Sequence, residues 1–285
     1  MRLIQHKREA YWFYRVLSLG YDDWVNPLFW TARMRDTALA AARLDRRDLE
    51  TLDAGAGTGF TTEGIVAHVD PLQVTMLDQS PHQLARAARR PALAGVRRLE
   101  GDAEQLPFPD DAFDRYVSAG SIEYWPDPQR GIAEAYRVLR SGGVGVVIGP
   151  VRPAGRLARA LADAWMLFPE QHEYREWFER AGFADVELLP VAPDWYRDRR
   201  VPYAVAVSGT KPAPGPSPLP PAPAAEDRRA PLTAGGRLRA AARFAAGSAA
   251  GFAFVPIALA MTLRARGLFR KNRPVPEQAP GLERR

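Results

Sequence analysis

A glycine-rich run behind an acidic residue is the part of this chain best suited to hold a ligand. Asp53 is followed by Gly55, Gly57 and Gly59 in the sequence LDAGAGTGF. Glycines at this spacing let the backbone turn sharply and approach a bound molecule where any Cβ atom would collide. A dinucleotide-binding G-x-G-x-x-G run would need a third glycine where this chain has Phe60. The run therefore indicates a ligand other than a dinucleotide, the alternative being a tight strand–helix turn that binds nothing.

A second acidic residue ends the next apolar run of the chain. Asp78 lies in the sequence VTMLDQS, about 20 residues after the glycine run, and is followed by Gln79. A carboxylate at the end of a strand can accept hydrogen bonds from both hydroxyls of a ribose. The alternative is a helix N-cap or a turn residue. Together with the glycine run, the position of Asp78 favours ribose binding.

The glycine run resembles motif I of the class I S-adenosylmethionine (SAM)-dependent methyltransferases. The cofactor of that superfamily has no phosphate, which fits the G-x-G-x-G spacing. The resemblance implies that Asp102 accepts a hydrogen bond from the adenine amino group and that the backbone N–H of Ala103 donates to a ring nitrogen. It also extends to Ser118, in the fourth apolar run, and to an L-x-x-G-G turn over residues 139–143. The implied cofactor-binding residues are Asp53, Gly55, Gly57, Gly59, Asp78, Gln79, Asp102, Ala103 and Ser118.

Short apolar runs and helical segments alternate along the chain from residue 50 to residue 150. The predicted strands are Glu50–Ala54, Gln73–Leu77, Val96–Leu99, Arg115–Ser118 and Val144–Ile148, with two more at Ala184–Leu189 and Tyr203–Ser208. Ser80 followed by Pro81 is a typical helix start. The alternation predicts an α/β fold with a doubly wound, mostly parallel sheet, here of seven strands. The resemblance to motif I implies that this sheet is the Rossmann-like one of the class I methyltransferases. Such sheets bind ligands at the carboxyl ends of their strands.

Longer stretches of the chain resemble one family within that superfamily. The sequence is similar to the plant-type 2-methyl-6-phytylbenzoquinol methyltransferases over residues 1–36, 60–68, 77–85, 116–139 and 164–183. The most specific match is SAGSIEYWPDPQRG. The resemblance implies C-methylation of the ring of a prenylated quinol by SAM, as in tocopherol and plastoquinone synthesis. A methyltransferase for another lipid (a sterol, a carotenoid or a phospholipid headgroup) and a non-catalytic module with the same fold are the alternatives.

Glu123 is the candidate catalytic residue. It follows the fourth predicted strand in the sequence SIEYW, where the methyl group would lie in this fold. A phenol has a pKa of about 10, so a positioned base would help a quinol hydroxyl to lose its proton. Loss of that proton makes the ring carbon nucleophilic. His82 and Asp22 are weaker candidates. A helix-capping or ion-paired carboxylate is the alternative for Glu123, and no metal ligand set is predicted.

Aromatic residues are concentrated ahead of the glycine run. They are Tyr11, Trp12, Phe13, Tyr14, Tyr21, Trp24, Phe29 and Trp30. Such residues fit a lid over a flat apolar substrate or a belt at a membrane interface, with a core-facing helix as the alternative. Trp165, Met166 and Phe168 are expected to complete the pocket, again with core packing as the alternative.

The proline content and the hydropathy divide the chain into a domain, a linker and a tail. We expect a methyltransferase domain over residues 1–210, with an aromatic-rich helical cap over 1–48, a proline-rich linker over 211–236, and a basic tail over 237–285. Residues 244–263 contain no charged side chain and are long enough to cross a bilayer, so they predict a membrane segment. An alanine-rich surface helix and a shallow or re-entrant segment are the alternatives. Gly247 and Gly251 form a G-x-x-x-G pair that is compatible with a homodimer, although an Ala/Gly-rich composition alone produces such pairs.

Charge and cysteine content narrow the partners and the compartment. Residues 211–285 hold 13 Lys/Arg and 4 Asp/Glu, whereas residues 1–210 hold 26 Lys/Arg and 29 Asp/Glu. The basic tail favours a membrane surface over a nucleic-acid partner. The chain has no cysteine, which fits a reducing compartment. No signal or transit peptide is recognised, so we expect attachment to a bacterial cytoplasmic membrane with the catalytic domain on the cytoplasmic side.

Overall fold

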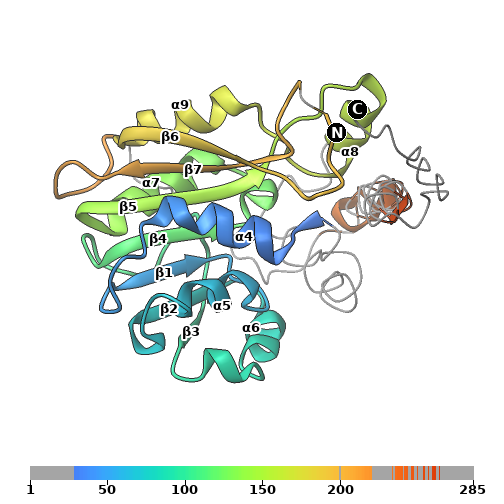
Figure 1. Ribbon diagram of the computed structural model, residues 1–285. Coiled ribbons are helices and arrows are strands. Elements are labelled where there is room, and N and C mark those ends of the chain that lie inside the picture. Colours follow the sequence, from blue (N-terminus) through green and yellow to red (C-terminus); the bar gives the residue numbers. More distant parts are fainter. Residues whose placement is uncertain are drawn as a thin grey trace, which may run out of the picture.

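A seven-stranded sheet forms the centre of the protein. The computed structural model describes residues 29–198 and 200–219, together with scattered positions between 233 and 263. The strands are β1 (Thr51–Ala54), β2 (Val74–Asp78), β3 (Arg97–Glu100), β4 (Phe113–Ala119), β5 (Leu139–Pro150), β6 (Ala184–Val191) and β7 (Ala204–Thr210). Their order is β3-β2-β1-β4-β5-β7-β6 (Figure 1). β1 to β5 are parallel to one another, whereas β7 is antiparallel to both β5 and β6. The predicted mostly parallel, Rossmann-like sheet is confirmed, with all seven strands.

Helices cover both faces of this sheet. They are α4 (Ala32–Leu39), α5 (Phe60–Val66), α6 (Pro81–Ala87), α7 (Pro128–Val138), α8 (Arg156–Trp165) and α9 (Gln171–Ala181), with short 3-10 turns at 40–42, 71–73, 91–93 and 122–124. Buried side chains of α4, α5 and α6 form one apolar cluster with the sheet. Those of α7 and α9 form a second cluster on the other face. Figure 1 shows α4 crossing the front of the sheet and α8 lying beyond its carboxyl edge.

Local capping explains why helices begin directly after the strands. The hydroxyl of Ser80 accepts a hydrogen bond from the backbone N–H of Gln83 at 3.4 Å, and Pro81 occupies the first turn of α6. The helix start predicted at Ser80-Pro81 is therefore confirmed. Asp127 caps α7 in the same way, by accepting from the backbone N–H of Arg130. These caps fix short loops at the carboxyl edge of the sheet.

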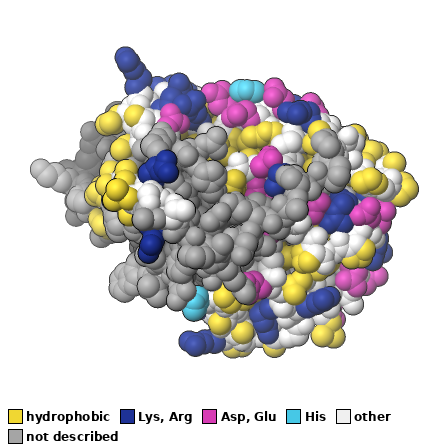
Figure 2. Space-filling model, turned by 180° about the vertical axis from the view of Figure 1, so that it is seen from behind, with side chains coloured by type: hydrophobic (Ala, Val, Ile, Leu, Met, Phe, Trp, Pro, Cys, Tyr) yellow, Lys and Arg dark blue, Asp and Glu magenta, His cyan; other side chains and the backbone are white. Residues whose placement is uncertain are grey.

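Charged side chains are balanced locally on the surface of the domain. Seen from behind, basic and acidic side chains are interspersed over the described part of the surface (Figure 2). Several of them pair, among them Arg90 with Glu63 at 2.8 Å and Arg140 with Asp114 at 2.9 Å. Exposed pairs of this kind each stabilise a fold by only about 0–1 kcal/mol. Their arrangement accords with the nearly balanced charge of residues 1–210.

Several sequence predictions concern parts of the chain outside the described residues. Residues 1–28 are outside them, and so is most of the predicted membrane segment 244–263, including Gly247 and Gly251. Of the helices in the described part of the chain, none combines the length and the apolar character that crossing a bilayer requires.

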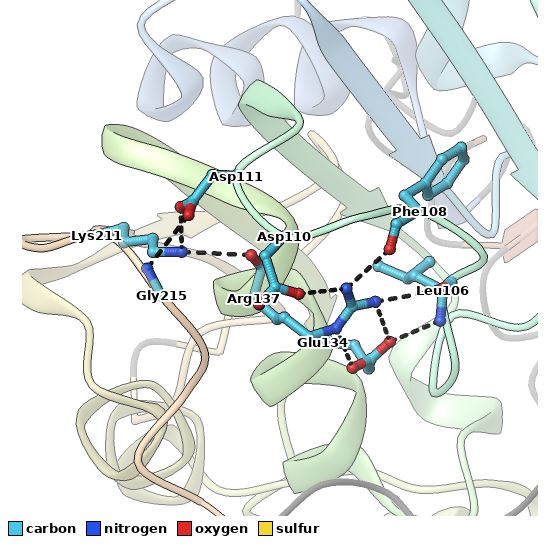
Figure 3. Close-up of polar contacts among 8 residues, drawn as sticks. All are labelled: Leu106, Phe108, Asp110, Asp111, Glu134, Arg137, Lys211 and Gly215. Carbon is cyan, nitrogen blue, oxygen red and sulfur yellow. Dashed lines mark hydrogen bonds and ion pairs between the residues drawn. The ribbon is translucent and has the colours of Figure 1, made fainter.

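The first residues of the predicted linker are docked on the domain (Figure 3). Lys211 is fully buried, and its Nζ donates to Asp111 Oδ1 at 2.8 Å and to the carbonyl oxygen of Arg137 at 3.3 Å. The same ammonium lies 4.9 Å from the centre of the Tyr136 ring. The backbone N–H of Gly215 donates to Asp111 Oδ2 at 3.2 Å. Residues 211–219 therefore leave the sheet along a fixed path.

Removal of Asp111 is expected to destabilise the fold more than removal of Lys211. Asp111→Ala would leave a buried ammonium without its counter-ion, which costs about 3–5 kcal/mol. Lys211→Met should cost less, because the Asp111 side chain is 34% exposed and can be hydrated. Urea unfolding at pH 7 measures both, with Asp48→Ala as the control, since Asp48 forms an exposed pair with Arg46. Equal losses for Asp111→Ala and Lys211→Met would contradict this account.

The pH dependence of the same pair has a defined sign. The hydrogen bond from Lys211 is the main cause that lowers the pKa of Asp111. A carboxyl whose pKa is lower in the folded state contributes stability above its unfolded pKa of about 3.9 and loses it as the pH falls through the folded value. The difference in unfolding free energy between wild type and Asp111→Asn should therefore shrink only below about pH 4.

Candidate functional site

A cavity of about 540 Å³ lies at the carboxyl edge of the sheet. Its volume is in the range of about 300–1,000 Å³ that is usual for ligand pockets. It is lined by the loops that follow β1 to β5 and by the connection between β6 and β7. It brings together Gly55, Gly57, Asp78, Gln79, Asp102, Ala103 and Glu123, all of which were predicted as site residues from the sequence.

The glycine loop forms one wall of the cavity. Gly55 has φ +72°, and a Cβ atom there would lie 2.1 Å from the hydroxyl oxygen of Ser121. Gly57 has φ +55°, but a Cβ atom there would meet no other atom within 4 Å. The backbone N–H of Gly57 donates to Asp78 Oδ2 at 2.8 Å. The loop is thus packed tightly at Gly55, and its hydrogen bond to Asp78 holds it in place. The open space beside Gly57 forms a cradle that a ligand can fill.

The carboxylates of Asp78, at the end of β2, and of Asp102, just after β3, are held by backbone donors. Asp78 Oδ1 accepts from the backbone N–H of Ser80 at 2.8 Å, and Asp102 Oδ1 accepts from that of Glu104 at 3.0 Å. A carboxylate offers only acceptor oxygens, so both groups suit the N–H and O–H donors of a ligand. Gln83 lines the same end of the cavity and was not predicted. Its Oε1 is buried without a hydrogen-bond partner among the described residues.

Three of the predicted site residues do not line the cavity, namely Asp53, Gly59 and Ser118. Asp53 is fully buried and accepts from the hydroxyl of Thr62 at 2.6 Å. Burial raises the pKa of Asp53 to about 7, the Thr62 hydrogen bond opposes the rise, and the charge of Asp78 adds to it. A Cβ atom on Gly59 would lie 2.3 Å from Leu93, so this glycine lets α5 pack closely. Ser118 is buried in β4.

Glu123 presents a carboxyl group with a raised pKa to the cavity. Burial raises the pKa of this side chain to about 7, and its Oε2 has no hydrogen-bond partner in the described part of the chain. The turn that carries it is held in place, because the carbonyl oxygen of Glu123 accepts from the backbone N–H of Leu167 at 3.1 Å. A carboxyl that titrates near neutral pH can act as a general base. His82 is exposed and away from the cavity lining, and Asp22 is outside the described residues.

The opposite end of the cavity is rich in aromatic side chains. Of the residues predicted for a lid or pocket, Phe29, Trp30, Met166 and Phe168 line it. The side chain of Trp165 is outside the described part of the structure. The cavity is also lined by Trp195, Tyr196 and Tyr203, which were not predicted from the sequence. The available signal was the concentration of three rings in the short segment DWYRDRRVPY between two strands.

Comparison with known proteins identifies close relatives of the chain. Residues 52–147 match a family model described as a methyltransferase domain. The chain is 57% identical over 234 residues to 2-methyl-6-phytyl-1,4-hydroquinone methyltransferase 2, chloroplastic, of Oryza sativa subsp. japonica, covering 81% of this chain and 67% of that protein. It is 56% identical over 234 residues to the corresponding protein of Spinacia oleracea, covering 81% and 68%.

A solved structure shares the fold. Geranyl diphosphate C-methyltransferase from Streptomyces coelicolor, in complex with Mg²⁺, geranyl diphosphate and S-adenosyl-L-homocysteine, matches with a TM-score of 0.55 and 15% identity. The match covers 63% of this chain and 78% of that one. At this identity the likeness concerns the fold alone.

The relatives also correct one expectation. From the sequence we expected the protein to be attached to a bacterial cytoplasmic membrane. This is wrong, because the similar rice and spinach proteins are chloroplastic plant enzymes.

Proposed function

Since this chain belongs to the family of 2-methyl-6-phytyl-1,4-hydroquinone methyltransferases, we propose that its cavity carries out the transfer of a methyl group from SAM to a ring carbon of a prenylated hydroquinone. The protein is a SAM-dependent methyltransferase, and the reaction belongs to prenylquinone biosynthesis. The observation that carries the proposal is the sequence similarity over most of the chain, which includes every loop of the cavity from Gly55 to Tyr203.

The end of the cavity formed by the first three strands is suited to hold the cofactor. We assign ribose binding to Asp78, with Gln79 beside it, and adenine binding to Asp102 and Ala103. The open cradle at Gly57 fits the amino-acid part of SAM, because a Cβ atom there would project into empty space. Asp53, Gly59 and Ser118 would act from below the loop, by fixing its shape. When bound, SAM supplies an electrophilic methyl group.

Glu123 is suited to handle the proton in this reaction. With a pKa of about 7, its carboxyl is substantially ionised at neutral pH and can accept a proton from a quinol hydroxyl. The ring carbon would then be nucleophilic toward the methyl group that bound SAM would supply. Restoring the aromatic ring moves the hydrogen of that carbon, as a proton, to the deprotonated hydroxyl oxygen, so the one net proton of the reaction stays on Glu123 until solvent takes it. The buried surroundings of Glu123 exclude water from its Oε2. The chain therefore aligns the ring, excludes water and takes up a proton.

The proposed function is tested by identifying the methylated product. Purified protein is incubated with methyl-labelled SAM and, separately, 2-methyl-6-phytylhydroquinone, a sterol, a carotenoid and a phospholipid. We expect label only in the ring of the hydroquinone. Label in another lipid would replace the substrate class, and SAM binding without any transfer would favour a non-catalytic module.

We further propose the division of the chain into a methyltransferase domain, a linker over 211–236 and a tail over 237–285 that contacts a bilayer through residues 244–263. The absence of charged side chains in that segment and the arginines around it support this proposal. The full chain should co-sediment with vesicles that contain anionic lipid, and its recovery in the supernatant would overturn it. A homodimer through Gly247 and Gly251 would appear as a doubled mass in sedimentation velocity in detergent.

A further inference from the structure

Four aromatic rings form a continuous wall at one end of the cavity. Phe29 and Trp195 meet edge to face with ring centres 6.2 Å apart, and Trp195 meets Tyr203 at 5.5 Å. Tyr196 contacts both Trp195 at 6.2 Å and Tyr203 at 5.3 Å. All four line the cavity. We call these residues the aromatic wall.

The sheet places this wall opposite the candidate cofactor residues. β7 runs antiparallel to β5, and Ala204 pairs with Pro150, so Tyr203 lies at the carboxyl edge. Asp102 follows β3 and Asp78 ends β2, at the other end of the same edge. Glu123 follows β4, which lies between them in the sheet order. A ring held beside Glu123 would therefore have the cofactor on one side and the aromatic wall on the other.

Hydrogen bonds hold the segment that carries the wall. The hydroxyl of Tyr196 donates to the carbonyl oxygen of Val201 at 2.9 Å. The guanidinium of Arg200 donates to both oxygens of Asp198, at 2.9 and 2.6 Å. The backbone N–H of Val151, after β5, donates to the carbonyl oxygen of Tyr203 at 3.0 Å. A wall held in place by such hydrogen bonds reduces the ordering cost of binding a ligand.

The wall is not explained by core packing alone. Neither Trp195 nor Tyr196 belongs to either of the two buried apolar clusters of the described residues, and both rings are half-buried at the cavity. Partly exposed aromatic rings around a cavity offer a large apolar surface to a ligand at little cost in side-chain entropy. A prenyl chain is the apolar part of the proposed substrate.

We infer that the aromatic wall binds the prenyl chain where it joins the quinol ring and so determines which quinols the enzyme accepts. The inference rests on the proposed function, which supplies a substrate with such a chain. It assigns substrate specificity to Trp195, Tyr196, Tyr203 and Phe29. Cofactor binding stays with the loops at the other end of the cavity.

The test separates binding of the chain from binding of the ring. The kinetic constants for 2-methyl-6-phytylhydroquinone are measured with wild type, Trp195→Phe and Trp195→Ala, at saturating SAM. The inhibition constant of 2,6-dimethylhydroquinone, in which a methyl group replaces the chain, is measured with the same proteins. In Trp195→Ala, KM for the phytyl quinol should rise at least about tenfold, while the inhibition constant of the chainless quinol changes less than about twofold. Trp195→Phe should fall between, because it keeps part of the ring surface.

The control is Trp177→Ala, which removes a half-buried tryptophan of α9 that packs against Tyr174, with ring centres 5.6 Å apart. Its KM for the phytyl quinol should match wild type. SAM affinity and the thermal midpoint are measured for every variant to exclude a folding defect. Equal changes for both quinols, or no change for either, would overturn the inference. Failure of wild type to methylate the phytyl quinol would instead overturn the proposed function.

Discussion

Replacing Glu123 with glutamine is expected to lower kcat for the prenylated hydroquinone by about 10²–10⁴-fold, the usual contribution of a general base. Glutamine keeps the shape of the side chain and its acceptor oxygen but cannot take up a proton at neutral pH. The affinity for SAM should be unchanged, because Glu123 follows β4 whereas the candidate cofactor residues follow β1, β2 and β3. Steady-state kinetics and calorimetric titration with SAM measure the two quantities. A kcat within about threefold of wild type would remove Glu123 from the mechanism.

The pKa of Glu123 also predicts the direction in which kcat/KM for the prenylated hydroquinone changes with pH. Burial raises the pKa of Glu123 to about 7, and the base is active when ionised, so kcat/KM should rise with pH and level off above that value. Asp53 also has a pKa of about 7, so the rise of kcat/KM near pH 7 does not by itself show which of the two carboxyl groups causes it. If this rise of kcat/KM with pH is lost in Glu123→Gln, the titrating group is Glu123. If the rise persists, another group causes it.

A matched control is available in the same cavity. Glu104 also lines the cavity, is buried, and accepts from the backbone N–H of Asp127 at 2.6 Å. Glu104→Gln makes the same chemical change and keeps an acceptor for that donor. We expect its kcat to fall less than about tenfold. Equal losses in Glu104→Gln and Glu123→Gln would mean that any change of charge in the cavity lowers activity.

The sequence was sufficient to predict that Gly55, Gly57 and Asp78 meet at one cavity, because these residues are close in the chain. Gly55 and Gly57 lie within one turn, and Asp78 is carried to them by a single helix and strand, so β1–α5–β2 connectivity alone brings these residues together. Parallel strands place all their carboxyl ends at one edge, which extends the argument to Asp102 and Glu123. What the order of residues does not reveal is which groups reach the cavity surface. Asp53 and Ser118 lie within β1 and β4, before the loops that line the cavity.

Three of the four rings of the aromatic wall were not predicted, because their place at the cavity depends on the direction of one strand. Trp195 and Tyr203 reach the cavity since β7 enters the sheet antiparallel, next to β5, and so begins at the edge where the other strands end. The segment before β7 has no periodic pattern that would indicate this. The path of residues 211–219 was also not predicted, because a proline-rich sequence does not indicate that Lys211 is buried against Asp111. Both features depend on contacts between residues far apart in the sequence.

The second large effect concerns Asp78, whose replacement by alanine should raise the Kd for SAM about 100-fold or more. Hydrogen bonds to a charged group contribute about 1.5–3 kcal/mol each, and a ribose would lose two of them. The change also removes the acceptor that holds Gly57, at 2.8 Å, so the cradle itself would loosen. Asp78→Asn keeps the shape and one acceptor oxygen, and its Kd should lie between those of wild type and alanine. Calorimetric titration of each protein with SAM gives these constants without relying on turnover.

Asp70 provides the control that separates ligand binding from loop geometry. Asp70 Oδ1 accepts from the backbone N–H of Leu72 at 2.9 Å, two residues on, in the same way that Asp78 Oδ1 accepts from Ser80. It precedes β2, however, and therefore lies at the amino edge of the sheet, away from the cavity. Asp70→Ala should lose a comparable local hydrogen bond and still bind SAM with the wild-type Kd. If Asp78→Ala also binds SAM within about threefold of wild type, the ribose is held by other groups, and the assignment of the cavity's cofactor end must be revised.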